Sequence, residues 1–386
     1  MAFEFRLPSL AEMNATIEGQ IMLNYSNKDD FGAMLLTGCA GSGKTTIAAY
    51  RLLRLANQNK NVKLFTFHKM LAYSIEMMLR NLGVSNANTY AATFKKWAYD
   101  ETNSSLTSDV DLLEKLALKL ALSPNVVEYI FDEAQDLPVC VYEKLPQYCD
   151  RFFLSCDDAQ RVHDEGATVR EIATVIKWKK RFDEHLLDRN FRNTYETYRF
   201  AIQFQPDENE AVRDPNLLQQ LEKNDEKRGD KPVVIEYWDV KQRDADLKMR
   251  LQNAVARGGS IAVLCPIGLK KRERYEGESV EGMHLVLLQM GFNCSVYHNE
   301  TNVPTDLKDI LITTFKSSKG LEFDEVYIPR YNFFKRIDNE WYVACTRARR
   351  QLVIYRDLEH ANVDPIKGFN ADTYQLLTQV NRASCN

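Results

Sequence analysis

A glycine-rich segment followed by lysine and threonines is the clearest chemical feature of this sequence. Residues 38–46 read GCAGSGKTT, after an apolar run at 33–36 and before the helix-forming residues 47–50. This order of strand, turn and helix predicts a phosphate cradle, because glycine-rich backbone N–H groups and the positive end of a helix both attract an oxyanion. Lys44 would reach the β- and γ-phosphates of ATP, and Thr45 would hold Mg²⁺. The residues expected to bind the nucleotide here are Gly38, Gly41, Ser42, Gly43, Lys44, Thr45 and Thr46.

A pair of adjacent acids, Asp132 and Glu133, is the second feature that could do chemistry. The pair directly follows the mostly apolar run 127–131, which predicts a strand. Ligands of open parallel sheets bind beside the carboxyl ends of the strands, so the two acids should lie beside the phosphate cradle. Asp132 would hold Mg²⁺, and Glu133 would accept a proton from the attacking water.

Short apolar runs alternate with amphipathic helical segments and must position these groups. In the first half, residues 62–66, 127–131 and 151–155 read as strands. Alternation of this kind predicts a parallel sheet with helices on both faces. The second half shows the same alternation of strands and helices but has no second phosphate-loop motif. Its expected strands are 233–237, 261–265, 309–313, 326–328 and 352–355.

The length of the chain predicts two domains. A chain of 386 residues exceeds what a single hydrophobic core usually supports. The polar, charged stretch 205–231 fits a boundary. We therefore expect an α/β protein with an amino-terminal lobe at 1–204, including a short insertion near 99–125, and a second lobe at 205–386. Two α/β lobes with one phosphate loop indicate a nucleotide site in the cleft between them.

Composition narrows the class of partners and the compartment. Apolar residues make up 45% of the chain, yet no apolar stretch has the length of a membrane span, and the first residues lack the features of a secretory signal. We therefore expect a cytoplasmic protein without membrane contacts. The eight cysteines form no C-x2-C pair of the kind that zinc or redox sites use. Because the net charge is −4, nucleic-acid binding must come from a local surface.

An ordered series of segments resembles the motifs of the UvrD/Rep-type, superfamily 1 DNA helicases. The resemblance implies two RecA-like P-loop lobes and an ATP-driven motor that moves on single-stranded DNA from 3′ to 5′. It covers most of the chain. The matching segments are GCAGSGKTT (38–46), TFHKMLA (66–72), TFKKWA (93–98), DEAQD (132–136), CDDAQRVH (156–163), NFRN (190–193), TTFKSSKGLEFDEV (313–326) and YVACTRARRQL (342–352).

The resemblance also implies which side chains act in the transition state of ATP hydrolysis. Gln160 would sense the γ-phosphate or position the water, since an amide both donates and accepts. Arg192 and Arg347 would supply cations to the phosphoryl oxygens, as arginine fingers do. Because Arg347 belongs to the second half, its engagement would require the lobes to close.

Three further residues would contact the adenosine part of ATP by resemblance. Phe191 stands where the family has a tyrosine that stacks on adenine, and an aromatic ring preserves the stacking. Glu322 would contact the ribose. Gln20 precedes the phosphate loop in a segment that matches the family only loosely, and would read the adenine edge.

A groove for single-stranded DNA is the other site that the resemblance implies. Such a groove needs aromatic faces and cations along the backbone. Taken singly, an aromatic residue more often belongs to the core. The residues expected in this groove are Phe67, His68, Thr93, Phe94, Trp97, His163 and Lys316.

The spacing of the segments departs from the family in length. Full members carry sizeable insertions in both lobes, whereas here only residues 99–131 separate TFKKWA from DEAQD. We therefore expect a motor that translocates on single-stranded DNA, or on the single-stranded tail of a duplex, without efficient unwinding. The alternative is a regulatory ATPase subunit that senses DNA and controls a partner such as a nuclease, in DNA repair or antiviral defence. A noncatalytic DNA-binding module is disfavoured by the intact ATP-site residues.

Overall fold

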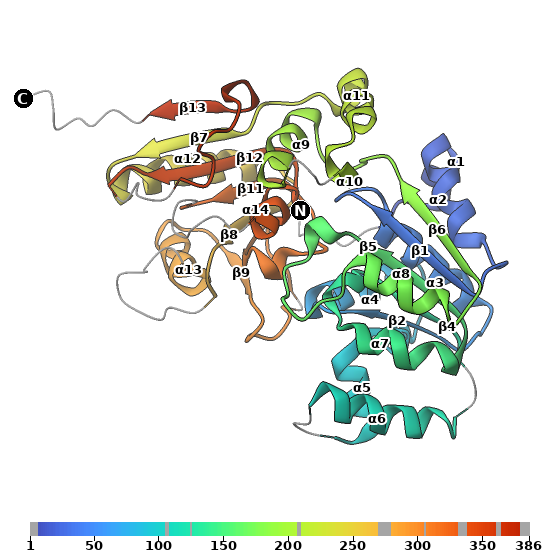
Figure 1. The fold of residues 1–386 in the computed structure, drawn as a ribbon. Coiled ribbons are helices and arrows are strands. Elements are labelled where there is room, and N and C mark those ends of the chain that lie inside the picture. Colours follow the sequence, from blue (N-terminus) through green and yellow to red (C-terminus); the bar gives the residue numbers. More distant parts are fainter. Residues whose placement is uncertain are drawn as a thin grey trace, which may run out of the picture. The chain divides into compact units, whose positions relative to one another are not determined.

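The computed structural model divides the chain into two compact units, residues 5–189 and residues 190–386. We call them the amino-terminal and carboxy-terminal units, and Figure 1 labels their elements. None of the helices in the described part of the chain has both the length and the apolar character that crossing a membrane requires. The described residues are 7–104, 108–123, 126–206, 210–268, 279–304, 306–330, 338–359 and 364–378.

The amino-terminal unit is built on a six-stranded parallel sheet in the order β3-β2-β4-β5-β1-β6. Its strands are β1 (Ala33–Gly38), β2 (Val62–Thr66), β3 (Ala91–Thr93), β4 (Val126–Phe131), β5 (Cys149–Cys156) and β6 (Phe182–Leu187). Its helices are α1 (Leu10–Asn14), α2 (Ile17–Asn27), α3 (Lys44–Asn57), α4 (Lys69–Asn81), α5 (Phe94–Thr102), α6 (Asp109–Leu120), α7 (Val139–Lys144) and α8 (Val169–Lys177). Residues of α5 to α8 pack on one face of the sheet, and α3 contacts its central strands without joining that cluster.

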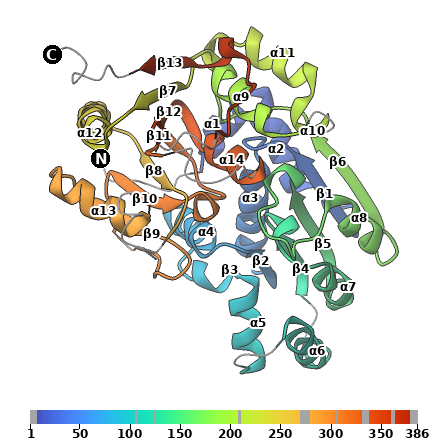
Figure 2. The ribbon, with the colours of Figure 1, turned by 60° about the vertical axis from the view of Figure 1, so that its left-hand side comes forward.

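The carboxy-terminal unit is built on a seven-stranded parallel sheet in the order β13-β7-β12-β11-β8-β10-β9. Its strands are β7 (Val233–Tyr237), β8 (Ile261–Cys265), β9 (Cys294–Tyr297), β10 (Ile310–Thr314), β11 (Phe323–Ile328), β12 (Ala348–Asp357) and β13 (Gln375–Thr378). Its helices are α9 (Tyr195–Ala201), α10 (Glu210–Arg213), α11 (Pro215–Lys223), α12 (Val240–Arg257), α13 (Val280–Gln289) and α14 (Asp338–Cys345). Figure 2 shows α12 and α13 on one side of this sheet and α14 on the other.

The predicted fold class is confirmed, because each unit is an α/β lobe with a parallel sheet. Strands 62–66, 233–237 and 261–265 have the bounds expected from the sequence. The strands that the sequence did not predict, β3, β6, β9 and β13, are the four edge strands of the two sheets. Edge strands are only partly covered, so their residues need not be continuously apolar, as β6 (FDEHLL) illustrates.

The two units divide between Arg189 and Asn190, whereas the sequence suggested a boundary after Phe204. Helix α9 packs against β12 and α14 of the carboxy-terminal unit, which explains why this segment belongs there. The polar stretch that suggested the boundary contains α11, whose Leu217 and Leu221 are buried. Part of this stretch is therefore a helix packed in the carboxy-terminal unit. The expected insertion near 99–125 corresponds to the end of α5 together with α6.

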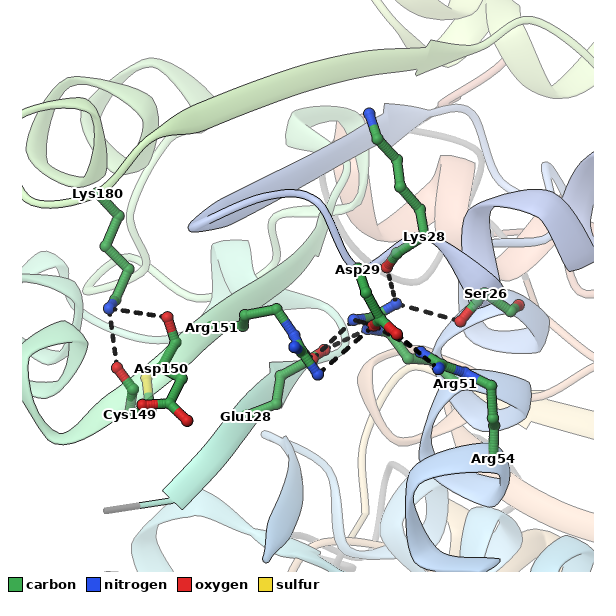
Figure 3. A network of polar contacts seen from close by, with 10 residues as sticks. All are labelled: Ser26, Lys28, Asp29, Arg51, Arg54, Glu128, Cys149, Asp150, Arg151 and Lys180. Atoms are coloured by element: carbon green, nitrogen blue, oxygen red, sulfur yellow. Dashed lines mark hydrogen bonds and ion pairs between the residues drawn. The ribbon is translucent and has the colours of Figure 1, made fainter. Parts of the chain in front are cut away.

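A buried ion pair between Arg51 and Glu128 connects α3 to β4 (Figure 3). Both side chains are completely buried. The Arg51 guanidinium donates to Glu128 Oε2 at 2.7 Å and also to the carbonyls of Ser26 at 3.1 Å and Lys28 at 2.6 Å. Glu128 additionally accepts from Arg151 Nε of β5 at 2.8 Å. Because its hydrogen bonds come from several elements, Arg51 holds α2, α3 and the sheet together.

We expect Arg51→Met to lower the free energy of unfolding by about 3–5 kcal/mol, because it leaves the Glu128 carboxylate buried with Arg151 as its remaining cation. Chemical denaturation would measure the loss. Arg54→Met is the matched control, since Arg54 pairs with the half-exposed Asp29 at 2.8 Å. The control should cost less than about 1 kcal/mol. Equal losses in the two variants would contradict the central role of Arg51.

Candidate nucleotide site

The phosphate loop joins β1 to α3 and requires glycine at Gly43. This residue caps α3 with φ of +92°, a left-handed conformation that glycine tolerates best. A Cβ atom at Gly43 would also lie 2.6 Å from the terminal methyl of Met22 in α2. The close approach of α2 and the positive φ both explain the glycine. The loop thereby presents the first turn of α3, whose N–H groups lack intrahelical partners, to a ligand.

Lys44 is held inside the loop. Its side chain is only 5% exposed, and its ammonium group donates to the carbonyl oxygens of Gly38 at 2.6 Å and Cys39 at 3.0 Å. Nζ also lies 3.9 Å from Oδ2 of Asp157. Within the described residues, the buried hydroxyl of Ser42 has no hydrogen-bond partner. A phosphate group would accept hydrogen bonds from both side chains, so the loop fits a nucleotide.

Asp132 ends β4 as a buried carboxylate with one unsatisfied oxygen. Ser155 donates a hydrogen bond to Oδ1, whereas Oδ2 has no hydrogen-bond partner in the described part of the chain. Burial, followed by the charge of Glu133, raises the pKa of Asp132 to about 6, against hydrogen bonds from Ser155 and Thr45 that lower it. An unsatisfied carboxylate oxygen beside a threonine hydroxyl suits Mg²⁺, which prefers oxygen ligands. The ion would neutralise phosphate charge there.

Glu133 has a strained backbone and a fixed side chain. Its φ of +58° lies in the left-handed region, which is costly for a residue with a side chain and is typical of functional sites. Gln135 Nε2 donates to the Glu133 carboxylate at 2.6 Å, and Gln135 Oε1 accepts from the backbone N–H of Asp157 at 3.1 Å. Gln160 Nε2 in turn donates to Asp157 Oδ2 at 2.6 Å. The structure thus gathers Glu133 and Gln160, as expected, into one buried network.

Sequence reasoning missed two members of this site, Ser155 and Gln135. Each carried a signal. Ser155 is a buried polar residue near the end of the central strand β5, directly after an apolar run, and such residues need a partner. Gln135 lies two residues after the proposed base, where a completely buried amide must also be bonded. Both partners proved to be the predicted acids, Asp132 and Glu133.

The expected nucleotide residues of the carboxy-terminal unit fall into two places. Arg192 Nε donates to Glu322 Oε2 at 2.9 Å, so the structure brings these two residues together. Arg347 is completely buried and donates to the carbonyl oxygens of Val343 at 2.9 Å and Leu321 at 3.1 Å. To act as an arginine finger, Arg347 would have to exchange one of these carbonyls for a phosphate oxygen.

Phe191 and Arg192 line a hollow of about 710 Å³ in the carboxy-terminal unit. The Phe191 ring is half-buried, and its carbonyl accepts a hydrogen bond from Lys227 at 2.5 Å. Most of the charged side chains around the hollow are cationic, which favours an anionic ligand. The cations are Arg192, Lys227, Arg228, Arg250, Arg257, Arg349 and Arg350, and the acids are Glu226, Asp230, Asp324 and Glu325.

Gln20 is exposed on α2. Its side-chain amide donates to the carbonyl oxygen of Asn14 at 2.9 Å, at the turn between α1 and α2. The same helix contacts the phosphate loop through Met22. The structure therefore places α2 beside the loop, with the Gln20 amide bonded to the preceding turn.

Two of the aromatic residues expected to line DNA lie in the core of the amino-terminal unit. Phe94 is 3% exposed and Trp97 is 8% exposed. Their rings pack against Phe65 with centroid separations of 5.5 and 4.5 Å. Residues three apart on a helix share a face, and this face of α5 is turned towards the sheet. Neither ring offers a free face for stacking on a base.

The remaining expected DNA residues differ in exposure. Phe67 and His163 are half-buried, with ring centroids 4.1 Å apart, whereas the neighbouring His68 is buried. Thr93 is half-buried, and its hydroxyl caps α5. In the carboxy-terminal unit, the side chain of Lys316 is 42% exposed, with Nζ 3.1 Å from the carboxylate of Glu340.

The fold is that of an α/β protein with a glycine-rich loop between β1 and α3, and helicases occur among the proteins to which the chain is similar. No protein-family model matches the chain. A segment of 55 residues, 13% of this chain, is 46% identical to the RecBCD enzyme subunit RecB of Chlamydia pneumoniae and spans 5% of that subunit.

Among solved structures, the Pif1 helicase from Candida albicans has a TM-score of 0.46 at 13% identity, over 96% of this chain and 97% of that one. The arterivirus nonstructural protein 10 (helicase), solved with DNA, has a TM-score of 0.40 at 13% identity, over 89% of this chain and 64% of that one. The carboxy-terminal domain of a possible DNA helicase from Lactobacillus plantarum WCFS1 has a TM-score of 0.34 at 16% identity, over 48% of this chain and 98% of that one. These likenesses are too low to assign a function, which must come from the site.

We expect Asp132→Asn to stabilise the metal-free and nucleotide-free protein by about 3 kcal/mol near pH 8, because it removes a buried ionised carboxylate. The pKa of Asp132 is raised in the folded state from an ordinary value of 3.8 to about 6. The penalty is therefore present above that raised pKa and disappears as the pH falls towards the ordinary value. Denaturation across this range would measure the difference, and a gap that widened on acidification would contradict the prediction.

Proposed function

We propose that this chain is an ATP-dependent, single-stranded DNA translocase of the superfamily 1 helicase type that hydrolyses ATP with Mg²⁺. The observation that carries the proposal is the pairing of a phosphate loop around Lys44 with the buried, unsatisfied Oδ2 of Asp132. A loop lysine and a strand-end carboxylate are the groups that P-loop NTPases use for phosphates and Mg²⁺. Movement from 3′ to 5′ follows from the motif resemblance and is part of the proposal.

Glu133 is the proposed general base of hydrolysis. Gln135 fixes its carboxylate through a hydrogen bond of 2.6 Å, which supports a defined orientation towards an attacking water. Gln160, fixed by Asp157, would position that water or sense the γ-phosphate. Arg192 and Arg347 are the proposed cationic contributors, with Phe191, Glu322 and Gln20 as proposed nucleotide contacts.

Single-stranded DNA is the proposed nucleic-acid partner. Partial exposure of Phe67, Thr93 and Lys316 supports contacts with bases and backbone, since stacking needs an accessible ring and phosphates attract an accessible cation. The buried Phe94 and Trp97 would support the fold beneath this surface.

The second candidate function is a DNA-sensing regulatory ATPase that controls a partner protein such as a nuclease. One observation favours it. In the described residues between β3 and β4, the chain forms only the helices α5 and α6. A duplex-contacting insertion is therefore absent from that described segment. Stimulation of the ATPase by DNA without strand separation would suit this role.

We expect steady-state ATP hydrolysis that requires Mg²⁺ and increases when single-stranded DNA is added. Glu133→Gln should lower the turnover number by at least about 10²-fold, because it removes the proposed base while keeping the hydrogen bond to Gln135. Nucleotide binding, measured by calorimetry, should persist in this variant.

Glu143→Gln is the control for that experiment, because Glu143 is an exposed acid on α7 of the same unit. Its turnover should match that of the unchanged protein. Absence of turnover with and without DNA would refute the translocase. Turnover that ignores DNA would leave a nucleotide-driven regulatory subunit.

We further expect the isolated chain to separate duplex DNA poorly, even when the duplex has a 3′ single-stranded tail. The physical reason is that the connection between β3 and β4 consists of α5 and α6 in the described residues. So short a connection offers little surface that could contact a duplex while the protein moves along the single strand. A strand-displacement assay beside a translocation assay on single-stranded DNA measures both activities. Vigorous, processive unwinding would contradict the expectation.

A further inference from the structure

Two histidines and an aspartate gather at one edge of the amino-terminal sheet. His68 follows β2 and caps α4, Asp136 ends the short helix η2 (Ala134–Asp136) after β4, and His163 lies in the loop after β5. Because β2, β4 and β5 are neighbours in a parallel sheet, their carboxyl ends bring the three side chains together.

Donor atoms of these three side chains all lie within 4.8 Å of one another. His68 Nε2 is 3.4 Å from Asp136 Oδ2, both side chains are almost completely buried, and Nε2 makes no hydrogen bond in the described part of the chain. Ligands that share a tetrahedral ion with bonds of about 2.0–2.2 Å lie roughly 3.3–3.6 Å apart. The His68–Asp136 pair already has this separation, and rotation of the half-buried His163 would close the set.

The surrounding backbone fixes the cluster. The loop that carries His163 passes directly over η2, where a Cβ atom on Gly166 would lie 2.2 Å from the carbonyl oxygen of Gln135. Ala167 N–H donates to Leu137 O at 3.0 Å, and Gly166 N–H donates to His163 O at 3.1 Å. These contacts hold His163 against Asp136 without help from the histidine side chain.

We propose that His68, Asp136 and His163 form a binding site for a divalent transition-metal ion, of which Zn²⁺ is the best fit. Two imidazoles and one carboxylate suit Zn²⁺ and its neighbours in the first transition series, whereas Mg²⁺ prefers oxygen ligands alone. Water would supply the remaining ligand, because His163 is half-exposed. The proposal does not depend on ATP hydrolysis, and the site is separate from the Mg²⁺ site proposed at Asp132.

An ion held here would tie two segments of the nucleotide site together. Helix η2 begins directly after Glu133, and the loop that carries His163 begins directly after Gln160. The His163 ring also packs on Phe67, so the ion would fix the orientation of a residue proposed to contact DNA. The ion would thus link the residues proposed for hydrolysis to those proposed for DNA binding within one lobe.

Metal binding can be measured directly on the full chain after removal of any histidine tag and treatment with a chelator. We expect one equivalent of Zn²⁺ to bind in the presence of excess Mg²⁺, which occupies the oxygen-rich site, and to raise the thermal unfolding midpoint. Co²⁺ should give the visible spectrum of a tetrahedral site with nitrogen and oxygen ligands, without the thiolate absorption that binding to cysteines would produce.

His163→Phe is the decisive variant, because it keeps a ring against Phe67 and removes both nitrogens. It should weaken Zn²⁺ binding by at least about tenfold and abolish the Zn²⁺-dependent thermal shift. Asp136→Asn provides the second test of the ligand set. His298→Asn is the control, since buried His298 lies 3.9 Å from a single carboxylate, that of Glu281, in the carboxy-terminal unit.

The outcomes separate the metal site from its alternative. If His163→Phe binds Zn²⁺ as tightly as the unchanged protein, or if neither protein binds it in excess Mg²⁺, the proposal is overturned. The cluster is then an ion-free contact between His68 and Asp136. Circular dichroism before the titration identifies a variant that fails to fold, and in that event the Co²⁺ spectrum of the unchanged protein decides. No readout uses ATP, so failure here leaves the proposed function untouched.

Discussion

The buried ion pair of Arg51 and Glu128 joins the two elements that carry the proposed nucleotide site, helix α3 and strand β4. Arg51 follows Lys44 by about two turns of α3, and Glu128 lies on the strand that ends just before Asp132. The pair therefore links the helix that starts at the phosphate loop to the strand that ends at the acidic pair. A buried ion pair is tolerated only when its geometry and its other hydrogen bonds are satisfied. We infer that Arg51 contributes mainly to the alignment of α3 with β4, which a purely apolar contact would specify less sharply.

The side chains of this proposed site themselves lower the stability of the folded state when no ligand is bound. Asp132 is buried with an unsatisfied oxygen, Glu133 has a left-handed backbone, and Lys44 binds carbonyl oxygens of its own loop. Strain and desolvation of this kind persist where the surrounding structure imposes them, and they are typical of functional sites. A nucleotide with its metal ion would form hydrogen bonds and metal bonds to the same groups. Ligand binding should therefore offset part of their free-energy cost and stabilise the folded protein.

A single edge of the amino-terminal sheet carries both sets of reactive side chains. The residues proposed to bind the nucleotide follow β1, β4 and β5, and the histidine cluster follows β2, β4 and β5. Segments after β4 and β5 thus contribute to both, through Glu133 and Asp136 on one turn and Gln160 and His163 on the next. The shared turns give a direct physical route by which occupancy of one set could alter the geometry of the other.

The phosphate-loop motif, the acidic pair at the end of β4 and the central strands of both sheets could all be predicted from the sequence. These features are local, because a glycine-lysine spacing and the continuous apolar run of a doubly covered strand can be read without knowing what packs on them. The exposure of each side chain and the contacts between distant residues came from the tertiary structure. It buried Phe94 and Trp97 in the core, revealed the edge strands, and brought His68 and His163 to Asp136. Those outcomes depend on strand order and on packing between segments far apart in the chain, and neither is encoded in any local pattern.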